Sequence, residues 1–115
     1  MDILDILPSC EYIQNSIEQG EDIRIVIDFE TGGPDYDPNN SKHRDALFIL
    51  RSLRHNISDS IYSLAIRQAR TSELYRAMIQ FEDGDLHESG VGRSESSVHE
   101  AVNLAIINLF QRAFK

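Results

Sequence analysis

The sequence has a single cysteine, no tryptophan and no long hydrophobic run. Because Cys10 has no second cysteine to pair with, an internal disulfide and a cysteine-based zinc motif are both excluded. No apolar stretch approaches the roughly 20 residues that a membrane-spanning helix needs. Residues 1–8 also lack the basic stretch and the apolar core of a secretory signal. We therefore expect a cytoplasmic protein that does not bind membranes.

Positive charge is scarce in the first third of the sequence. Residues 1–40 contain ten acidic residues and one basic residue, Arg24, which gives a net charge of −9. The other 75 residues contain nine acidic and ten basic residues, a net charge of +1, so the total of −8 arises in an acidic N-terminal segment, residues 1–40. This distribution argues against a basic surface over the whole chain, and we expect no direct binding of nucleic acid.

Hydrophobic periodicity predicts a single α+β domain over residues 1–115, with elements in the order α-β-α-β-β-β-α. Helical spacing of apolar residues predicts three helices, over 10–19, 42–55 and about 98–114. The residues expected to cap these helices are Ser9, Ser41 and Ser97. Alternating residues predict four strands, over 22–30, 61–68, 74–81 and 86–91. A tight-turn signal, Asp83-Gly84, joins the last two, so we expect a mostly antiparallel sheet with helices packed against it.

Residues 25–33, IVIDFETGG, place Asp28 and Glu30 two positions apart at the end of a predicted strand. This segment resembles the first motif of the DEDD exonuclease superfamily, in which two carboxylates bind the metal ions that activate water for phosphodiester cleavage. Residues 55–59, HNISD, resemble the second motif of that family. Its third motif, a histidine followed five residues later by aspartate, is missing after both histidines of the C-terminal part. A metal-dependent nuclease using Asp28 and Glu30 is therefore an alternative hypothesis.

Residues 75–110 contain a strand, a turn, a second strand with Gly90-x-Gly92-x-Ser94, and an alanine-rich helix. This order is similar to the C-terminal half of a double-stranded RNA-binding domain, in which lysines at the start of the last helix contact phosphates. The matching positions here are Glu95, Ser96 and His99. The resemblance therefore implies a shared shape without the cations that drive RNA binding.

A third resemblance spans about residues 34–109. Its segments are a tyrosine-containing loop at 34–38, a helix with Asp-Ala followed by apolar residues at 45–53, and AVNLAI at 101–106. Together these segments resemble the phage ABA sandwich domain family, small proteins encoded by phages and prophages. The resemblance implies a phage-derived accessory protein in the cytoplasm of a host cell, and it supplies no catalytic residue.

Four acidic residues, Asp28, Glu30, Asp35 and Asp37, lie at the end of the first predicted strand and in the loop after it. Their carboxylates could hold a divalent cation, form an acidic docking surface, or simply face solvent. We predict that they bind a partner, because a surface of one charge steers association with a partner of opposite charge. We predict no catalytic residue, no metal ligand and no cofactor.

The leading functional hypothesis is a non-enzymatic phage or mobile-element accessory protein that binds a basic protein partner through its acidic N-terminal surface. In its concrete form, the carboxylates imitate nucleic-acid phosphates and inhibit a host nucleic-acid-binding enzyme of defence or DNA processing. Two alternatives stay open. One is the nuclease, and the other is a self-associating structural module whose association would cover an exposed strand edge.

Overall fold

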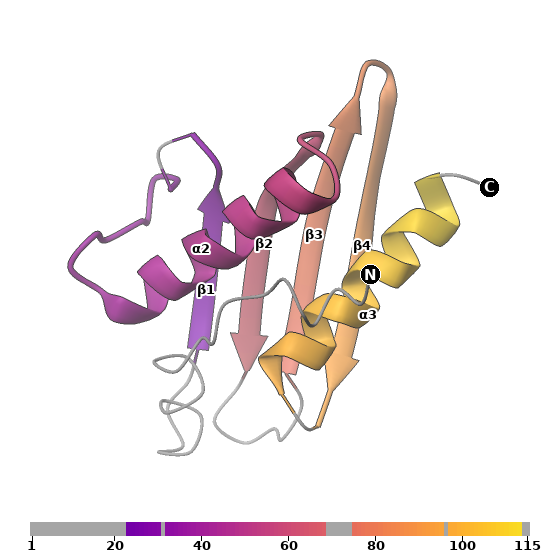
Figure 1. The fold of residues 1–115 in the computed structure, drawn as a ribbon. Coiled ribbons are helices and arrows are strands. Elements are labelled where there is room, and N and C mark those ends of the chain that lie inside the picture. The colour runs from indigo at the N-terminus through magenta and orange to yellow at the C-terminus, as the bar shows by residue number, and fades with distance from the viewer. Residues whose placement is uncertain (1–22, 31, 69–74, 96, 114–115) are drawn as a thin grey trace.

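The computed structural model describes residues 23–30, 32–68, 75–95 and 97–113. These residues form four strands: β1 (Ile23–Asp28), β2 (Ile61–Gln68), β3 (Tyr75–Asp83) and β4 (Leu86–Ser94). They also form two helices: α2 (Ser41–Asn56) and α3 (Val98–Ala113). The strands make one antiparallel sheet in the order β1-β2-β3-β4 (Figure 1). The predicted α+β class and the order of these elements are confirmed, whereas the helix predicted over 10–19 lies outside the described residues.

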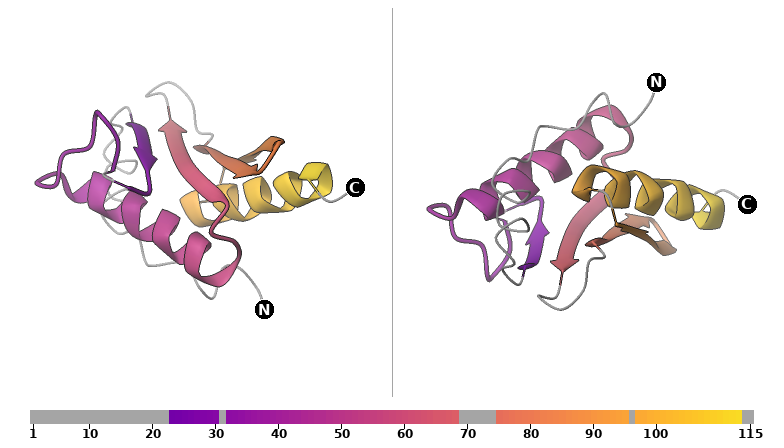
Figure 2. Two further views of the ribbon diagram at one scale, coloured as in Figure 1. Left: turned by 90° about the horizontal axis from the view of Figure 1, so that it is seen from above. Right: turned by 90° about the horizontal axis from the view of Figure 1, so that it is seen from below.

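Both described helices pack on the same face of the sheet (Figure 2). Helix α2 covers β1 and β2, and α3 covers β3 and β4. The inward residues of the strands, such as Ile27, Leu64 and Ile79, are fully buried against the apolar stripes of the helices, which include Leu50 and Val102. The core therefore lies between the sheet and the two helices, and the described helices leave the other face uncovered.

Two glycines of β4 let α3 lie directly on the sheet. A Cβ atom on Gly90 would be 2.1 Å from the carbonyl oxygen of Ala105, and one on Gly92 would be 2.0 Å from that of Ala101. No other residue type fits such an approach, because every other side chain begins with a Cβ. The strand prediction over 86–91 ended too early for this reason: Gly92 interrupts the alternation, yet β4 continues to Ser94.

The caps of the helices agree with the sequence only in part. Ser97 caps α3 as predicted, since its Oγ accepts the Glu100 N–H at 3.1 Å. The prediction of Ser41 as the cap of α2 is wrong. Asn40 occupies that position, in an extended conformation, and its side chain accepts the N–H groups of Lys42 and His43. Asn40 and Ser41 both have capping propensity, but Asn40 is the extended residue before the helix and Ser41 is the first helical residue.

Replacing Asn40 with alanine should lower the free energy of unfolding by about 1 kcal/mol, because two backbone N–H groups of the first turn lose their acceptor. Ser41→Ala is the matched control and should change the free energy of unfolding by less than about 0.5 kcal/mol. The Ser41 Oγ accepts a hydrogen bond from the Arg44 guanidinium at an exposed position, and such a bond contributes little. Urea denaturation monitored by circular dichroism measures both. A larger loss for Ser41→Ala than for Asn40→Ala would contradict this assignment of the cap.

Candidate binding surfaces

The four acidic residues predicted to bind a partner lie at the end of β1 and in the loop that leads to α2. Asp28 is half-buried, and its Oδ1 accepts the Glu30 N–H at 3.0 Å. Asp37 is exposed, and its Oδ1 accepts the Asn39 N–H at 2.9 Å. Both carboxylates thus stabilise local turns, as aspartate commonly does. Glu30 and Asp35 are exposed.

These carboxylates do not gather into a metal-binding arrangement. Among the residues that the structure describes, no group of three or more histidine, cysteine, aspartate or glutamate side chains is placed to hold a metal ion. The Asp28 carboxylate instead accepts the backbone N–H of Glu30, the second acidic residue of the segment that resembles a nuclease motif. Three of the four residues, Glu30, Asp35 and Asp37, are exposed, whereas Asp28 is half-buried and belongs to a local turn.

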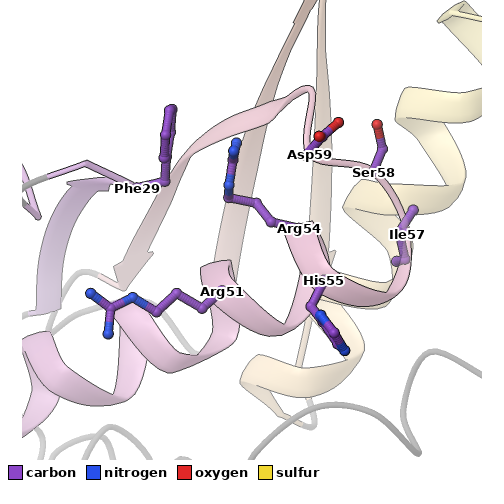
Figure 3. Close-up of a pocket in the computed structure, with 7 residues that line it drawn as sticks. All are labelled: Phe29, Arg51, Arg54, His55, Ile57, Ser58 and Asp59. Carbon is purple, nitrogen blue, oxygen red and sulfur yellow. The ribbon is translucent and has the colours of Figure 1, made fainter.

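A groove of about 720 Å³ lies at the C-terminal end of α2 (Figure 3). The Arg54 guanidinium stacks 3.6 Å from the centre of the Phe29 ring and donates a hydrogen bond to the carbonyl of Ile61. Arg54 therefore ties α2 to the end of β1 and to the start of β2. In Figure 3 the side chains of Arg51 and His55 point in other directions, so the three side chains do not converge on one point. We assign this groove a structural role centred on Arg54.

The sheet face opposite the two helices, here called the open sheet face, carries ordered rows of side chains. Residues paired across antiparallel strands share a face, so the register places them in rows that cross all four strands. The arginine row is Arg24, Arg67, Arg76 and Arg93. The neighbouring apolar row is Val26, Ala65, Met78 and Val91. The third row is polar and consists of Asp28, Ser63, Gln80 and Ser89.

The arginine row and the apolar row are accessible. All four arginine side chains are exposed, and Val26 keeps 51% of its surface exposed. Between the central strands, Ala65, Arg67, Arg76 and Met78 line a hollow of about 160 Å³. Within residues 23–30, 32–68, 75–95 and 97–113, the structure contains no hydrogen bond or ion pair from any of the four guanidinium groups. The open sheet face therefore presents a row of positive charge that lies beside the apolar row.

No group in the part of the chain that the structure describes neutralises the arginine row, and such a row is electrostatically unfavourable. Side chains directly opposite each other on neighbouring strands have Cβ atoms about 5 Å apart, and like charges at that distance destabilise the sheet. The row contains three such pairs: Arg24–Arg67, Arg67–Arg76 and Arg76–Arg93. Local choices that work against folding stability are typical of functional surfaces. Anionic groups of a partner would be attracted to the guanidinium groups and would offset the repulsion between them.

Sequence reasoning did not identify the arginine row, because its four members are far apart in the chain and only strand pairing aligns them. Comparison with protein-family models, with curated proteins and with solved structures finds no match. None of the described helices is long and apolar enough to cross a membrane. The candidate site therefore stands on its geometry alone.

Proposed function

We propose that this protein is a binding module that docks a negatively charged protein partner on its open sheet face. The observation that carries the proposal is the row of four exposed arginines across four strands. Arginine suits this role because its planar guanidinium donates paired hydrogen bonds to carboxylates. The apolar row beside it supplies area that loses water on contact, which a purely electrostatic surface lacks.

A second proposal keeps the hypothesis drawn from the acidic segment, a phage-derived accessory protein that binds a basic partner. Its support is that Glu30, Asp35 and Asp37 all have exposed side chains around one loop. Such a surface would attract a nucleic-acid-binding enzyme by charge. The two proposals demand partners of opposite charge, so one experiment separates them.

Fluorescence anisotropy with labelled poly-L-glutamate and poly-L-lysine of equal length tests both proposals. We expect the full chain to bind polyglutamate, more weakly as salt rises from about 50 to 200 mM, because salt screens exposed charges. Arg67→Gln with Arg76→Gln should weaken this binding about tenfold, since each exposed ion pair contributes up to about 1 kcal/mol.

The matched control is Arg44→Gln with Arg51→Gln, which removes the same charge from two exposed positions of α2. This pair should change polyglutamate binding less than twofold. Equal weakening by both pairs, or no binding of polyglutamate, would contradict docking on the open sheet face. Binding of polylysine that is lost on Glu30→Gln with Asp35→Asn would support the second proposal instead.

A further inference from the structure

We infer that the partner element is an acidic amphipathic α-helix of about three turns that lies across all four strands; this inference rests on the proposed function. Its apolar stripe would contact the row Val26, Ala65, Met78 and Val91. Its carboxylates would face the arginine row, which is parallel to the apolar row and one step of two residues away along each strand.

The dimensions of the two rows match such a helix. Neighbouring strands lie about 4.8 Å apart, so a row that crosses four strands spans about 14 Å. A helix rises 1.5 Å per residue, so about ten residues cover that length. Side chains at positions i, i+3, i+4 and i+7 then form one stripe, and acidic side chains flanking the stripe fall on the arginine side.

The hollow in the centre of the open sheet face could hold one apolar side chain of the partner helix. Ala65 is the smallest member of the apolar row, and it lies directly opposite Met78 in the register. Its small side chain leaves room that Arg67 and Arg76 border. Methionine adapts its shape to what it contacts, and the aliphatic stems of arginine also pack against apolar groups. One large apolar side chain of the helix would fill this hollow.

The chemistry of the rows favours a helix over two other ligands. Single-stranded nucleic acid is held largely by stacking of bases on aromatic rings, and none of the twelve residues in the three rows is phenylalanine, tyrosine or tryptophan. An extended peptide would add to the outer edge of β1 or β4 through main-chain hydrogen bonds, and two carbonyls of β4 already accept hydrogen bonds from α3, that of Val91 from Asn108 and that of Ser89 from Arg112. Neither mode uses an arginine row and an apolar row together.

Three labelled 14-residue peptides of leucine, glutamate and alanine test the inference by anisotropy and circular dichroism. The first has leucines at helical spacing flanked by glutamates, the second has the same composition in scrambled order, and the third is a copy of the first with lysine for glutamate. We expect the first to bind at least tenfold more tightly than the second and to gain helicity on binding. The lysine peptide should not bind.

A variant of the apolar row separates shape from charge. Met78→Gln keeps an unbranched side chain of similar length at a half-buried position of the open sheet face, so the fold should be retained, as its thermal unfolding would verify. Met78→Gln should weaken binding of the amphipathic peptide about tenfold and leave binding of the scrambled peptide unchanged. Equal affinity of the amphipathic and the scrambled acidic peptide would overturn the inference of a helical partner. The proposed docking of a negatively charged protein would not be affected by that result.

The last probe in these titrations is a single-stranded oligonucleotide with the same net charge as the acidic amphipathic peptide. Tighter binding of the oligonucleotide than of the amphipathic peptide, lost on Arg67→Gln with Arg76→Gln, would overturn the inference in favour of nucleic acid. Failure of every acidic probe, polyglutamate included, would overturn the proposed function itself. The two failures are therefore distinguishable within one set of titrations.

Discussion

Replacing Gly92 with alanine should lower the free energy of unfolding by about 2 kcal/mol or more. The added Cβ would lie 2.0 Å from the carbonyl oxygen of Ala101 and 2.4 Å from the backbone nitrogen of Ala105. Both atoms belong to the backbone of α3, so no side-chain rotation relieves the clash and the whole helix must move away from β4. Overpacking of this kind costs about 1–3 kcal/mol, and the lower backbone entropy of unfolded alanine offsets less than 1 kcal/mol of it.

Urea denaturation of Gly92→Ala, monitored by circular dichroism, measures this loss. Ser89→Ala is a suitable control because Ser89 belongs to the same strand but faces the open side. We expect the control to stay within about 0.5 kcal/mol of the original protein. Similar unfolding free energies for the two variants would show that α3 is not held against the glycines of β4.

Much of the fold could be predicted because the sequence follows simple periods. Buried residues of the strands alternate, as in Ile25 and Ile27, and those of α3 recur at helical spacing, as in Ala101, Ala105 and Leu109. The end of β4 could not be predicted in this way. Glycine normally weakens a strand, and only the position of the helix explains why glycine is needed there.

The pairing of Arg76 with Arg93 depends on which two residues form the turn between β3 and β4. Gly84 has φ of +60° in the predicted tight turn, and Asp83 pairs with Leu86 across it. The two turn residues are therefore Gly84 and Asp85, one position later than the Asp83-Gly84 signal predicts. Counting back from Gly84-Asp85 places Arg76 opposite Arg93, whereas a turn at Asp83-Gly84 would have placed Arg76 opposite Val91.

The other two pairs of the row have no tight turn from which to count. Residues 69–74 separate β2 from β3 without a tight-turn signal, and the whole of α2 separates β1 from β2. Register there depends on which residues of each strand are buried under the helices. The pairs Arg24–Arg67 and Arg67–Arg76 thus follow from packing of the core and not from local sequence.

Reversing the charge of the two central arginines, Arg67→Glu with Arg76→Glu, should weaken binding of the acidic amphipathic peptide by about 100-fold. The row changes from four arginines to two arginines and two glutamates, a change in charge from +4 to 0. Two attractive contacts are lost and two repulsive ones are created. At up to about 1 kcal/mol each, these changes together reach the nearly 3 kcal/mol of a 100-fold loss.

The same variant should unfold no more easily than the original protein. Two of the three like-charged pairs become opposite-charged, Arg24 with residue 67 and residue 76 with Arg93, and only the central pair stays alike. Cross-strand pairs differ by about 0.2–1 kcal/mol between these cases, so we expect a gain of about 0.5 kcal/mol in urea denaturation.

Loss of binding together with unchanged or higher stability distinguishes a functional surface from a structural one. Arg44→Glu with Arg51→Glu provides the control, because it makes the same change in net charge on the exposed side of α2. If the control pair weakened peptide binding as strongly as Arg67→Glu with Arg76→Glu does, the total charge of the protein and not the arginine row would govern binding. If the reversed row instead lost several kcal/mol of stability, its arginines would be part of what holds the sheet together. Only the combination of lost affinity and retained stability fits a sheet face whose repulsion an acidic partner relieves.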